Sequence, residues 1–282
     1  MTNFDRKYSF VASPPGGAGF EVGQGEPMPL RINFSIEKAD TETPNTARIS
    51  LWNLNPEHIA MLNEKDCMVK LRAGYRLGNV TLVFVGDITY VKTIMDAADR
   101  ETIIEVADGR VCLRDTYVAK SYAGVINTKT IIEDTAGEMG VAVTFSYNAE
   151  FADFPNGFSF IGPARVCLDK ACATSNLQWQ IYNGVLQIKN SRDTMDREVY
   201  VLSPESGLLG IPKRITYSED GSGTDEQPGW EVEYLLNGAI NISDFVRLES
   251  KFVQGFFRVK WIEMNGDNIR GAWKCTARLI YA

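Results

Sequence analysis

The feature that most constrains this chain is an alternation of apolar and polar residues with a period of two, which recurs at both ends of the sequence. LRINFSIE (30–37), TARISLWNL (46–54) and CMVKLRAGY (67–75) show it near the start, and GWEVEYLLN, DFVRLESKF and GFFRVKWIEMN near the end. Successive side chains of a strand point to opposite faces of a sheet, so the alternation predicts strands with one buried face. We therefore expect a mainly β protein with antiparallel sheets at both ends.

The middle of the chain has a different period. TKTIIEDTAGEMG (128–140) and PARVCLDKACATSN (163–176) repeat their apolar residues at helical spacing. In 177–190, Asn183-Gly184 stands between two alternating runs, the strongest short signal for a hairpin turn. These patterns predict a small α/β insert.

Three domains are therefore expected: a first β-barrel domain at 1–114, a small α/β domain at 115–190 and a second β-barrel domain at 191–282. The two outer domains resemble each other along the sequence. Three pairs of segments correspond in order: 47–55 with 230–238, 66–75 with 244–252, and 83–109 with 255–280. Two similar β units in one chain would let a trimer present six quasi-equivalent positions around an axis.

Three shorter features are predicted from local composition. Pro56 is placed to open a short helix that reaches Leu62, because proline is tolerated in a first turn. The Gly/Pro-rich segment 12–29 and the polar segment 219–229 are expected to be loops. Long loops in compact domains are often functional, so we expect a neighbouring subunit to order these two.

The charge balance argues against a protein that grips nucleic acid. The formal net charge is −7 and no block of basic residues is present, whereas duplex binding relies on clustered Lys and Arg. An acidic surface would repel DNA, which is compatible with an acidic channel that DNA passes without sticking.

The sequence gives no signal for secretion, membrane insertion or a cysteine framework. The start of the chain has no apolar signal segment, and no run is long and apolar enough to span a bilayer. We therefore expect synthesis in a reducing host cytoplasm and no membrane binding. The cysteines are odd in number and lack CxxC spacing, so neither disulfides nor zinc are expected; they are Cys67, Cys112, Cys167, Cys172 and Cys275.

No residue is predicted to be catalytic, cofactor-binding or metal-ligating. His58 is the only histidine, and nucleophilic catalysis would need it as the base. Glu133, Asp134 and Glu138 resemble the paired acids of glycosidases, but they suit the solvated face of a helix. Asp153 could belong to a sugar-cleaving cleft, but Pro155, Asn156 and Gly157 closely follow it, and a turn is the simpler explanation.

The glycines and tryptophans also have structural interpretations. The segment 16–19 lies between strands and does not open a helix, so it lacks the context of a phosphate-binding loop. The five tryptophans mostly lie in alternating strands and are expected to be core anchors or interface residues; they are Trp52, Trp179, Trp230, Trp261 and Trp273.

Several segments resemble the baseplate hub proteins of contractile-tailed phages, in an order that runs across nearly the whole chain. They are ISLWNLNPE (49–57), LRAGY (71–75) followed by VFVGDI, SGLLGIPKRI (206–215), and LLNGAINISDFVRLES followed by GFFRVKWIEMNGDNIRGAW. The resemblance implies two tube-like β-barrel domains joined by α/β elements, assembled as a homotrimer around a DNA channel. It also implies contacts with the tail tube protein, the central spike protein and other baseplate proteins, with the tape measure protein as a further candidate.

The function expected from this resemblance is that of a structural subunit of the virion tail baseplate, not an enzyme. The hub would connect the tail tube to the spike, with DNA only as a transient passenger. Two alternatives remain open at this point: a tail-associated peptidoglycan hydrolase and a carbohydrate-binding appendage. The sequence does not identify channel-facing or interface residues.

Overall fold

The computed structural model describes residues 5–23, 25, 28–41, 43–76, 78, 80–96, 98–190, 193–195, 198–218 and 226–282. The chain forms two compact units. The first comprises Met1–Thr41, Asn45–Ala107 and Glu198–Ala282, and the second comprises Glu42–Pro44 and Asp108–Arg197. The predicted mainly β fold with an α/β insert is confirmed.

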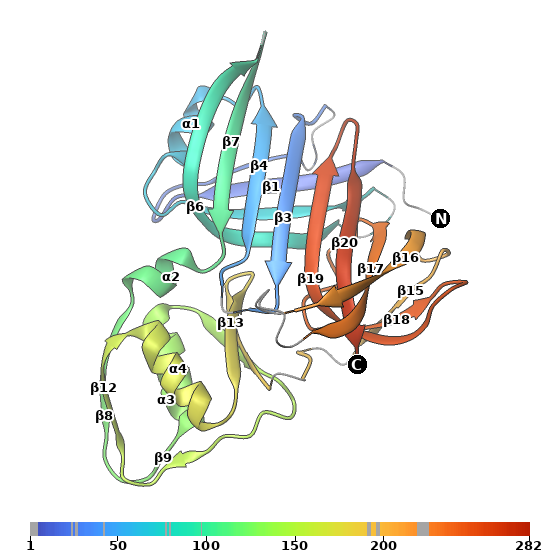
Figure 1. Ribbon diagram of the computed structural model, residues 1–282. Helices are drawn as coiled ribbons and strands as arrows, with labels where there is room; N and C mark the ends of the chain where they lie inside the picture. Colours follow the sequence, from blue (N-terminus) through green and yellow to red (C-terminus); the bar gives the residue numbers. More distant parts are fainter. Residues whose placement is uncertain are drawn as a thin grey trace. The chain divides into compact units, whose positions relative to one another are not determined.

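The first unit is built on one large sheet whose strands come from both ends of the chain (Figure 1). Its N-terminal elements, called here the first strand set, are β1 (Arg6–Ser13), β2 (Phe20–Val22), β3 (Ile32–Ala39), β4 (Thr46–Trp52), β5 (Met68–Tyr75), β6 (Val80–Asp96) and β7 (Asp99–Ala107), with helix α1 (Pro56–Leu62) between β4 and β5. The helix confirms the role predicted for Pro56, and Asn55 caps it by accepting from the backbone N–H of Glu57.

The C-terminal elements form the second strand set. They are β15 (Val199–Leu202), β16 (Leu208–Tyr217), β17 (Gln227–Leu235), β18 (Phe245–Glu249), β19 (Gln254–Asp267) and β20 (Trp273–Tyr281). All of them pair antiparallel except β15 with β18, which run parallel.

The two strand sets share one pairing order. In the first, β3 pairs β4, β4 pairs β7, β7 pairs β6, β6 pairs β5 and β5 pairs β1. In the second, β16 pairs β17, β17 pairs β20, β20 pairs β19, β19 pairs β18 and β18 pairs β15. The three segment correspondences predicted from the sequence fall on matching strands of this order. Both sets belong to one compact unit, and folding of each as a separate domain remains a prediction.

Alternation explains why these segments are strands. In β3, Ile32, Phe34 and Ile36 are almost fully buried, while the residues between them are exposed or half-buried. Val232 and Tyr234 do the same in β17. Because the side-chain period is two, the burial of one face fixes the register of each strand.

The second unit is the small α/β insert. Its strands are β8 (Tyr117–Tyr122), β9 (Ile126–Asn127), β10 (Ala142–Phe145), β11 (Asp153–Phe154), β12 (Phe158–Pro163), β13 (Gln178–Tyr182) and β14 (Val185–Lys189), and its helices are α2 (Arg110–Asp115), α3 (Thr128–Met139) and α4 (Ala164–Thr174). Helices α3 and α4 share one apolar core with β13 and β14, which includes Ile132, Leu168 and Leu186. Both predicted helices are confirmed.

The predicted hairpin turn at Asn183-Gly184 is confirmed too. Both residues have positive φ, at 50° and 79°, as a type I′ turn requires. The carboxylate of Asp108 accepts hydrogen bonds from both backbone N–H groups, so a side chain from outside the hairpin fixes its turn.

Parts of the loop predictions are wrong. Segment 12–29 contains β2, which pairs with β1 through Val22 opposite Phe10. In segment 219–229, residues 227–229 belong to β17, and residues 219–225 lie outside the described part of the chain. A three-residue strand held by its neighbour carries too little alternation to be seen in a Gly/Pro-rich sequence.

Candidate assembly site

The strand sets meet where β3 pairs antiparallel with β19, a junction we call the seam (Figure 1). On its buried side, Met264 stands opposite Ile36 and Gly266 opposite Phe34. A Cβ added to Gly266 would lie 2.2 Å from Cζ of Phe34, far inside van der Waals contact. Gly266 is therefore needed for the Phe34 ring to cross the seam.

The opposite side of the seam is polar. Glu263 stands directly opposite Glu37, a like-charged arrangement that is unfavourable by itself. The indole Nε1 of Trp261 donates to Glu37 at 2.8 Å, and the guanidinium of Arg278 lies 4.3 Å from the centre of the Trp261 ring. The tryptophan therefore links one glutamate of the seam to a nearby cation.

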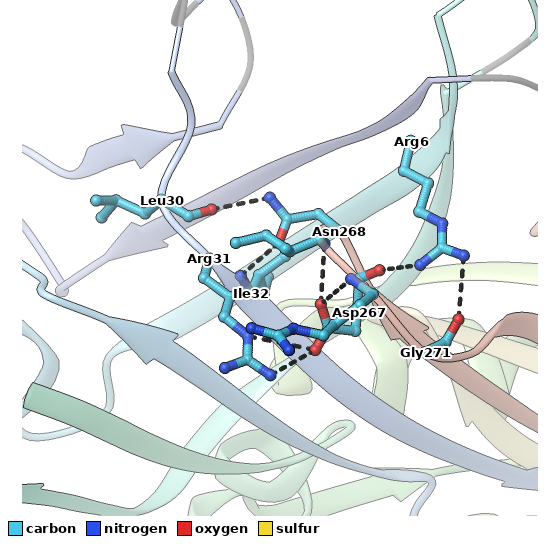
Figure 2. Close-up of polar contacts among 9 residues, drawn as sticks. Arg6, Leu30, Arg31, Ile32, Asp267, Asn268 and Gly271 are labelled. Atoms are coloured by element: carbon cyan, nitrogen blue, oxygen red, sulfur yellow. Dashed lines mark hydrogen bonds and ion pairs between the residues drawn. The ribbon is translucent and has the colours of Figure 1, made fainter. Parts of the chain in front are cut away.

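The turn between β19 and β20, residues 268–272, is held against the first strand set by Asp267 (Figure 2). Arg31 donates to the Asp267 carboxylate at 2.9 Å through Nη2 and at 3.3 Å through Nε. Arg6, from β1, donates to the backbone carbonyls of Asp267 and Gly271. Arg6 and Arg31, both distant in sequence, thus bind the end of the β19–β20 hairpin.

Asn268 completes this group. Its side-chain oxygen accepts from the backbone N–H of Ile32 at 2.9 Å, and its amide donates to the carbonyl of Leu30 at 3.0 Å (Figure 2). The Arg31 guanidinium also lies 4.3 Å from the centre of the Trp52 ring. We call Arg6, Arg31, Asp267 and Asn268 the clamp.

The environment of Asp267 favours its charged form. Burial by itself would raise the pKa of this carboxyl, but the backbone N–H groups of Arg270 and Ile269 and the side chain of Arg31 outweigh burial and hold the pKa below its usual value. The clamp is therefore an ionised, hydrogen-bonded contact at neutral pH. It joins both strand sets at the end of the seam.

Among the described residues, no ion pair like that of Arg31 and Asp267 holds the matching hairpin end of the first set, between β6 and β7. Its polar contacts include those of Asn53, which donates to Asp99 at 2.9 Å and accepts from the backbone N–H of Arg100, and the guanidinium of Arg100 donates to the carbonyl of Leu54 at 3.2 Å. Met95 is 71% exposed and Tyr90 51% exposed on the same hairpin. One hairpin is thus secured within the chain, while its counterpart presents apolar side chains.

Two strand edges are open within the described residues. Strand β19 carries β20 on one side and, on the other, β18 along residues 254–258 and then β3 along residues 261–267. Strand β6 carries β7 on one side and, on the other, only β5 along residues 80–87. In the described chain, no strand fills the place on β6 that β3 fills on β19. The outer side of β16, the counterpart of β3, is likewise unpaired.

The polar face of the sheet mixes both signs of charge. Ion pairs join Arg48 to Glu105 at 3.9 Å, Lys274 to Glu233 at 2.9 Å and Arg278 to Glu231 through Nε at 3.5 Å. The hydrogen bond from Lys274 lowers the pKa of Glu233. This face therefore carries ion pairs between basic residues and glutamates and is not uniformly acidic.

The residues that suggested enzyme chemistry lie apart in structural roles. The His58 ring stacks on Phe20, with ring centres 4.1 Å apart. Glu133 pairs with Lys129 at 3.8 Å, and Glu138 pairs with Lys120 at 2.6 Å. The Glu138 hydrogen bond raises the pKa of Lys120.

The other two acids are also engaged. Asp134 accepts from the Tyr122 hydroxyl at 2.5 Å; burial, followed by this bond, raises the tyrosine's pKa. Asp153 accepts from Asn127 at 2.7 Å. Each of these four carboxylates therefore has its own hydrogen-bond or ion-pair partner.

The glycines of segment 16–19 follow β1 in a turn before β2. Trp179 and Trp273 are core residues, 6% and 5% exposed, while Trp52 and Trp261 lie under arginines. Trp230 donates to the Tyr281 hydroxyl at 3.3 Å.

The clamp was not predicted from the sequence. Its only signal was the polar tip in NGDNIRG, and no pattern in the chain indicates that Arg6 and Arg31 reach it. Among the described residues, no group of three or more His, Cys, Asp or Glu side chains is arranged to hold a metal ion. None of the described helices has the length and apolar character that crossing a bilayer requires.

Comparison with solved structures identifies the fold as that of tail proteins. The 43 kDa tail protein of prophage MuSo2 from Shewanella oneidensis superposes with a TM-score of 0.63 at 9% identity, covering 97% of this chain and 96% of that one. The tail protein from Neisseria meningitidis MC58 gives 0.60 at 10% identity, with the same coverage. The c3393 protein of E. coli, a component of the type VI secretion system, gives 0.59 at 11% identity over 92% of this chain and 76% of that one.

The family follows from the sequence. Residues 18–256 match the family model described as baseplate hub gp41, and the chain belongs to this family. Curated proteins give no match to the sequence. The expected resemblance to baseplate hubs is confirmed, and the protein is a structural component of a phage tail baseplate.

Proposed function

We propose that this protein is the hub subunit that closes, as a homotrimer, into a ring with pseudo-sixfold symmetry between the tail tube and the central spike. The observation that carries the proposal is the seam. The seam joins two strand sets of the same pairing order inside one chain. Within the described residues, each set also keeps one unpaired edge for a neighbour: β6 beyond residue 87 in the first set and the outer side of β16 in the second.

The open edges give the ring a specific geometry. Inside the chain, β3 of the first set pairs with residues 261–267 of β19. Strand β16 is the counterpart of β3, and the open side of β6 beyond residue 87 is the counterpart of that part of β19. We expect β16 of one copy to pair with β6 of the next, repeating the seam between chains. Edge pairing would also cover strands that otherwise invite aggregation.

Strand β16 has the properties of an edge that awaits a partner. Pro212 lies within it, and proline is confined to edge strands in sheets. Ile211 is 62% exposed beside it. Three chains would supply six strand sets, which matches a threefold spike to a sixfold tube.

The polar face of the sheet is proposed to line the channel. Three of its cations, Arg48, Lys274 and Arg278, are paired with glutamates, so a passing phosphate backbone would not meet them as free charges. This replaces the expected acidic lumen with a charge-balanced wall. DNA would be a transient passenger, held by neither sign of charge.

The proposed partners are the tail tube protein, the spike and other baseplate proteins, and the tape measure protein is a further candidate. Likeness to a chain from a PdpA–VgrG complex, with a TM-score of 0.56 over 99% of this chain and 65% of that one, supports placement near a spike. No catalytic activity is proposed, since the candidate acids have separate structural partners.

Ring formation is tested by mass photometry and electron microscopy of the purified chain, alone and with tube and spike proteins. Thr216→Pro is the key variant. Thr216 faces Pro228 across β16 and β17; Pro228 has no N–H to donate, which indicates that the N–H of Thr216 points to the open edge. The variant should keep the fold and lose the ring, and Thr216→Val, which retains the N–H, should keep both. A wild-type chain that stays monomeric with both partners present would exclude the proposal.

A further inference from the structure

Lys70 and Arg72 lie two residues apart on β5 and therefore point to the same face of the sheet. Ser9 of β1 stands opposite Arg72, and Val11 stands opposite Lys70. Glu21 of β2 stands opposite Val11. These five side chains line a hollow of about 470 Å³, which we call the basic hollow.

The cations of the basic hollow are not neutralised by the described chain. No carboxylate of the described residues forms an ion pair with Lys70 or Arg72. The one acid on the lining, Glu21, accepts a hydrogen bond from the Ser9 hydroxyl at 2.7 Å. The hollow therefore carries a local positive excess on a chain with a net charge of −7.

The corresponding position of the second strand set carries an ion pair instead of two cations. Arg247 and Glu249 of β18 correspond to Lys70 and Arg72 of β5, and the leucines between them, Leu248 and Leu71, are both fully buried. Arg247 bonds to Glu249 at 2.8 Å through Nε and lies over the Phe256 ring. An internal ion pair thus occupies one set, and two uncompensated cations occupy the other.

We propose that the basic hollow is a docking site for an acidic segment of a partner protein, bound through carboxylates to Lys70 and Arg72. Charge complementarity favours this occupant. Two cations on one strand are spaced for alternate carboxylates of an extended peptide, because side chains on one face of a strand recur every second residue. Val11, which stands opposite Lys70, supplies a small apolar part of the lining. A membrane is a poorer fit, since the site is a recess and not a broad basic surface.

The basic hollow would make the two kinds of strand set differ in partner binding, although they share one pairing order. If the ring of the proposed function forms, the hollow occurs three times and the closed ion pair three times, alternating around it. An acidic partner would then bind at every second position. Only this count rests on the proposed function; the hollow itself lies within one chain.

The test uses the full chain and a short fluorescein-labelled peptide of alternating Glu and Ala, with fluorescence anisotropy as the readout. Lys70→Gln with Arg72→Gln should weaken binding about tenfold, since both charged contacts are lost. The matched control is Lys65→Gln with Lys251→Gln, which removes the same charge from other exposed positions and should bind like the wild type. Circular dichroism establishes that each variant is folded.

A third variant tests the direction of the effect. Glu21→Gln removes the acid that competes for the cations, so it should tighten binding several-fold. Equal losses in the double variant and its control would overturn the proposal. So would no binding by the wild type, or binding of tripolyphosphate or phosphatidylglycerol vesicles without the peptide. Mass photometry of the same samples reports the ring separately, so loss of the ring with peptide binding intact contradicts only the proposed function.

Discussion

The two strand sets have one pairing order but different surfaces. The hairpin end of the second set is clamped by Arg6 and Arg31, whereas the hairpin of the first set presents Met95 near its end and Tyr90 farther along β6. The edge strand β1 is covered by β2 in the first set, and β15 has no such added strand among the described residues. The two sets therefore share their order of strand pairing. They differ in whether the hairpin end and the edge strand are covered by contacts within the chain.

The largest effect on this comparison is expected from the clamp. Asp267→Ala removes the partner of Arg31 and the acceptor of two backbone N–H groups. Arg31 remains partly exposed, so the cost should be about 3 kcal/mol in the free energy of unfolding, at the low end for a broken buried pair. Chemical denaturation measures it.

Asp99→Ala, at the matching hairpin end of the first set, is the control. Its partner Asn53 is exposed to solvent, so the cost should stay below about 1 kcal/mol. Equal losses at the two ends would mean that the clamp is no stronger than an ordinary turn contact, and the contrast between the two hairpins would disappear.

The next effect concerns packing across the seam. Gly266→Ala would force a methyl group against Phe34 and should cost about 2 kcal/mol through overpacking. Adding Phe34→Leu should recover part of the loss by making room. A lowered melting temperature in the single variant without recovery in the double variant would show that another neighbour limits the space.

A smaller effect should appear at acid pH. The pKa of Asp267 is lower in the folded chain than its ordinary value near 3.8, so its stabilising contribution is complete above that ordinary value. It is lost as the pH falls through the folded value. Titrations of unfolding free energy should therefore show a steeper decline below about pH 4 for the wild type than for Asp267→Asn. Parallel curves would contradict an ionised clamp.

The smallest expected difference is in the rate at which cysteines buried in the two strand sets react with an alkylating reagent. Burial raises the pKa of Cys67 in the first set to about 11, with Glu64 adding to the effect, and raises that of Cys275 in the second to about 12. At mildly alkaline pH, iodoacetamide should modify the half-buried Cys112 first, then Cys67, then Cys275, because the thiolate is the reactive form. Peptide mass mapping over time gives this order. Rapid labelling of Cys275 would indicate a loosely packed second set.

The sequence supported prediction of whatever depends on local periodicity. The strands around Ile32–Ala39 and Gln227–Leu235, helices α3 and α4, and the turn at Asn183-Gly184 follow from spacing within a few residues. The order of segments also indicated that the two ends of the chain correspond. These features need no knowledge of distant contacts.

The clamp and the basic hollow could not be predicted in this way. Arg6 and Asp267 are separated by 261 positions, and no local pattern links them. Lys70 and Arg72 look like ordinary solvent-facing residues of an alternating strand, and only the pairing of β1 with both β2 and β5 turns them into a recess. Tertiary arrangement, not propensity, creates both sites.

The seam also has a kinetic consequence. Because β3 and β19 belong to one polypeptide, their encounter is intramolecular and does not depend on protein concentration. Any closed assembly of this chain contains an even number of strand sets, since they are always delivered in twos. In a closed ring, half of the junctions between strand sets therefore form within single chains and need no bimolecular collision, and odd numbers of sets are excluded.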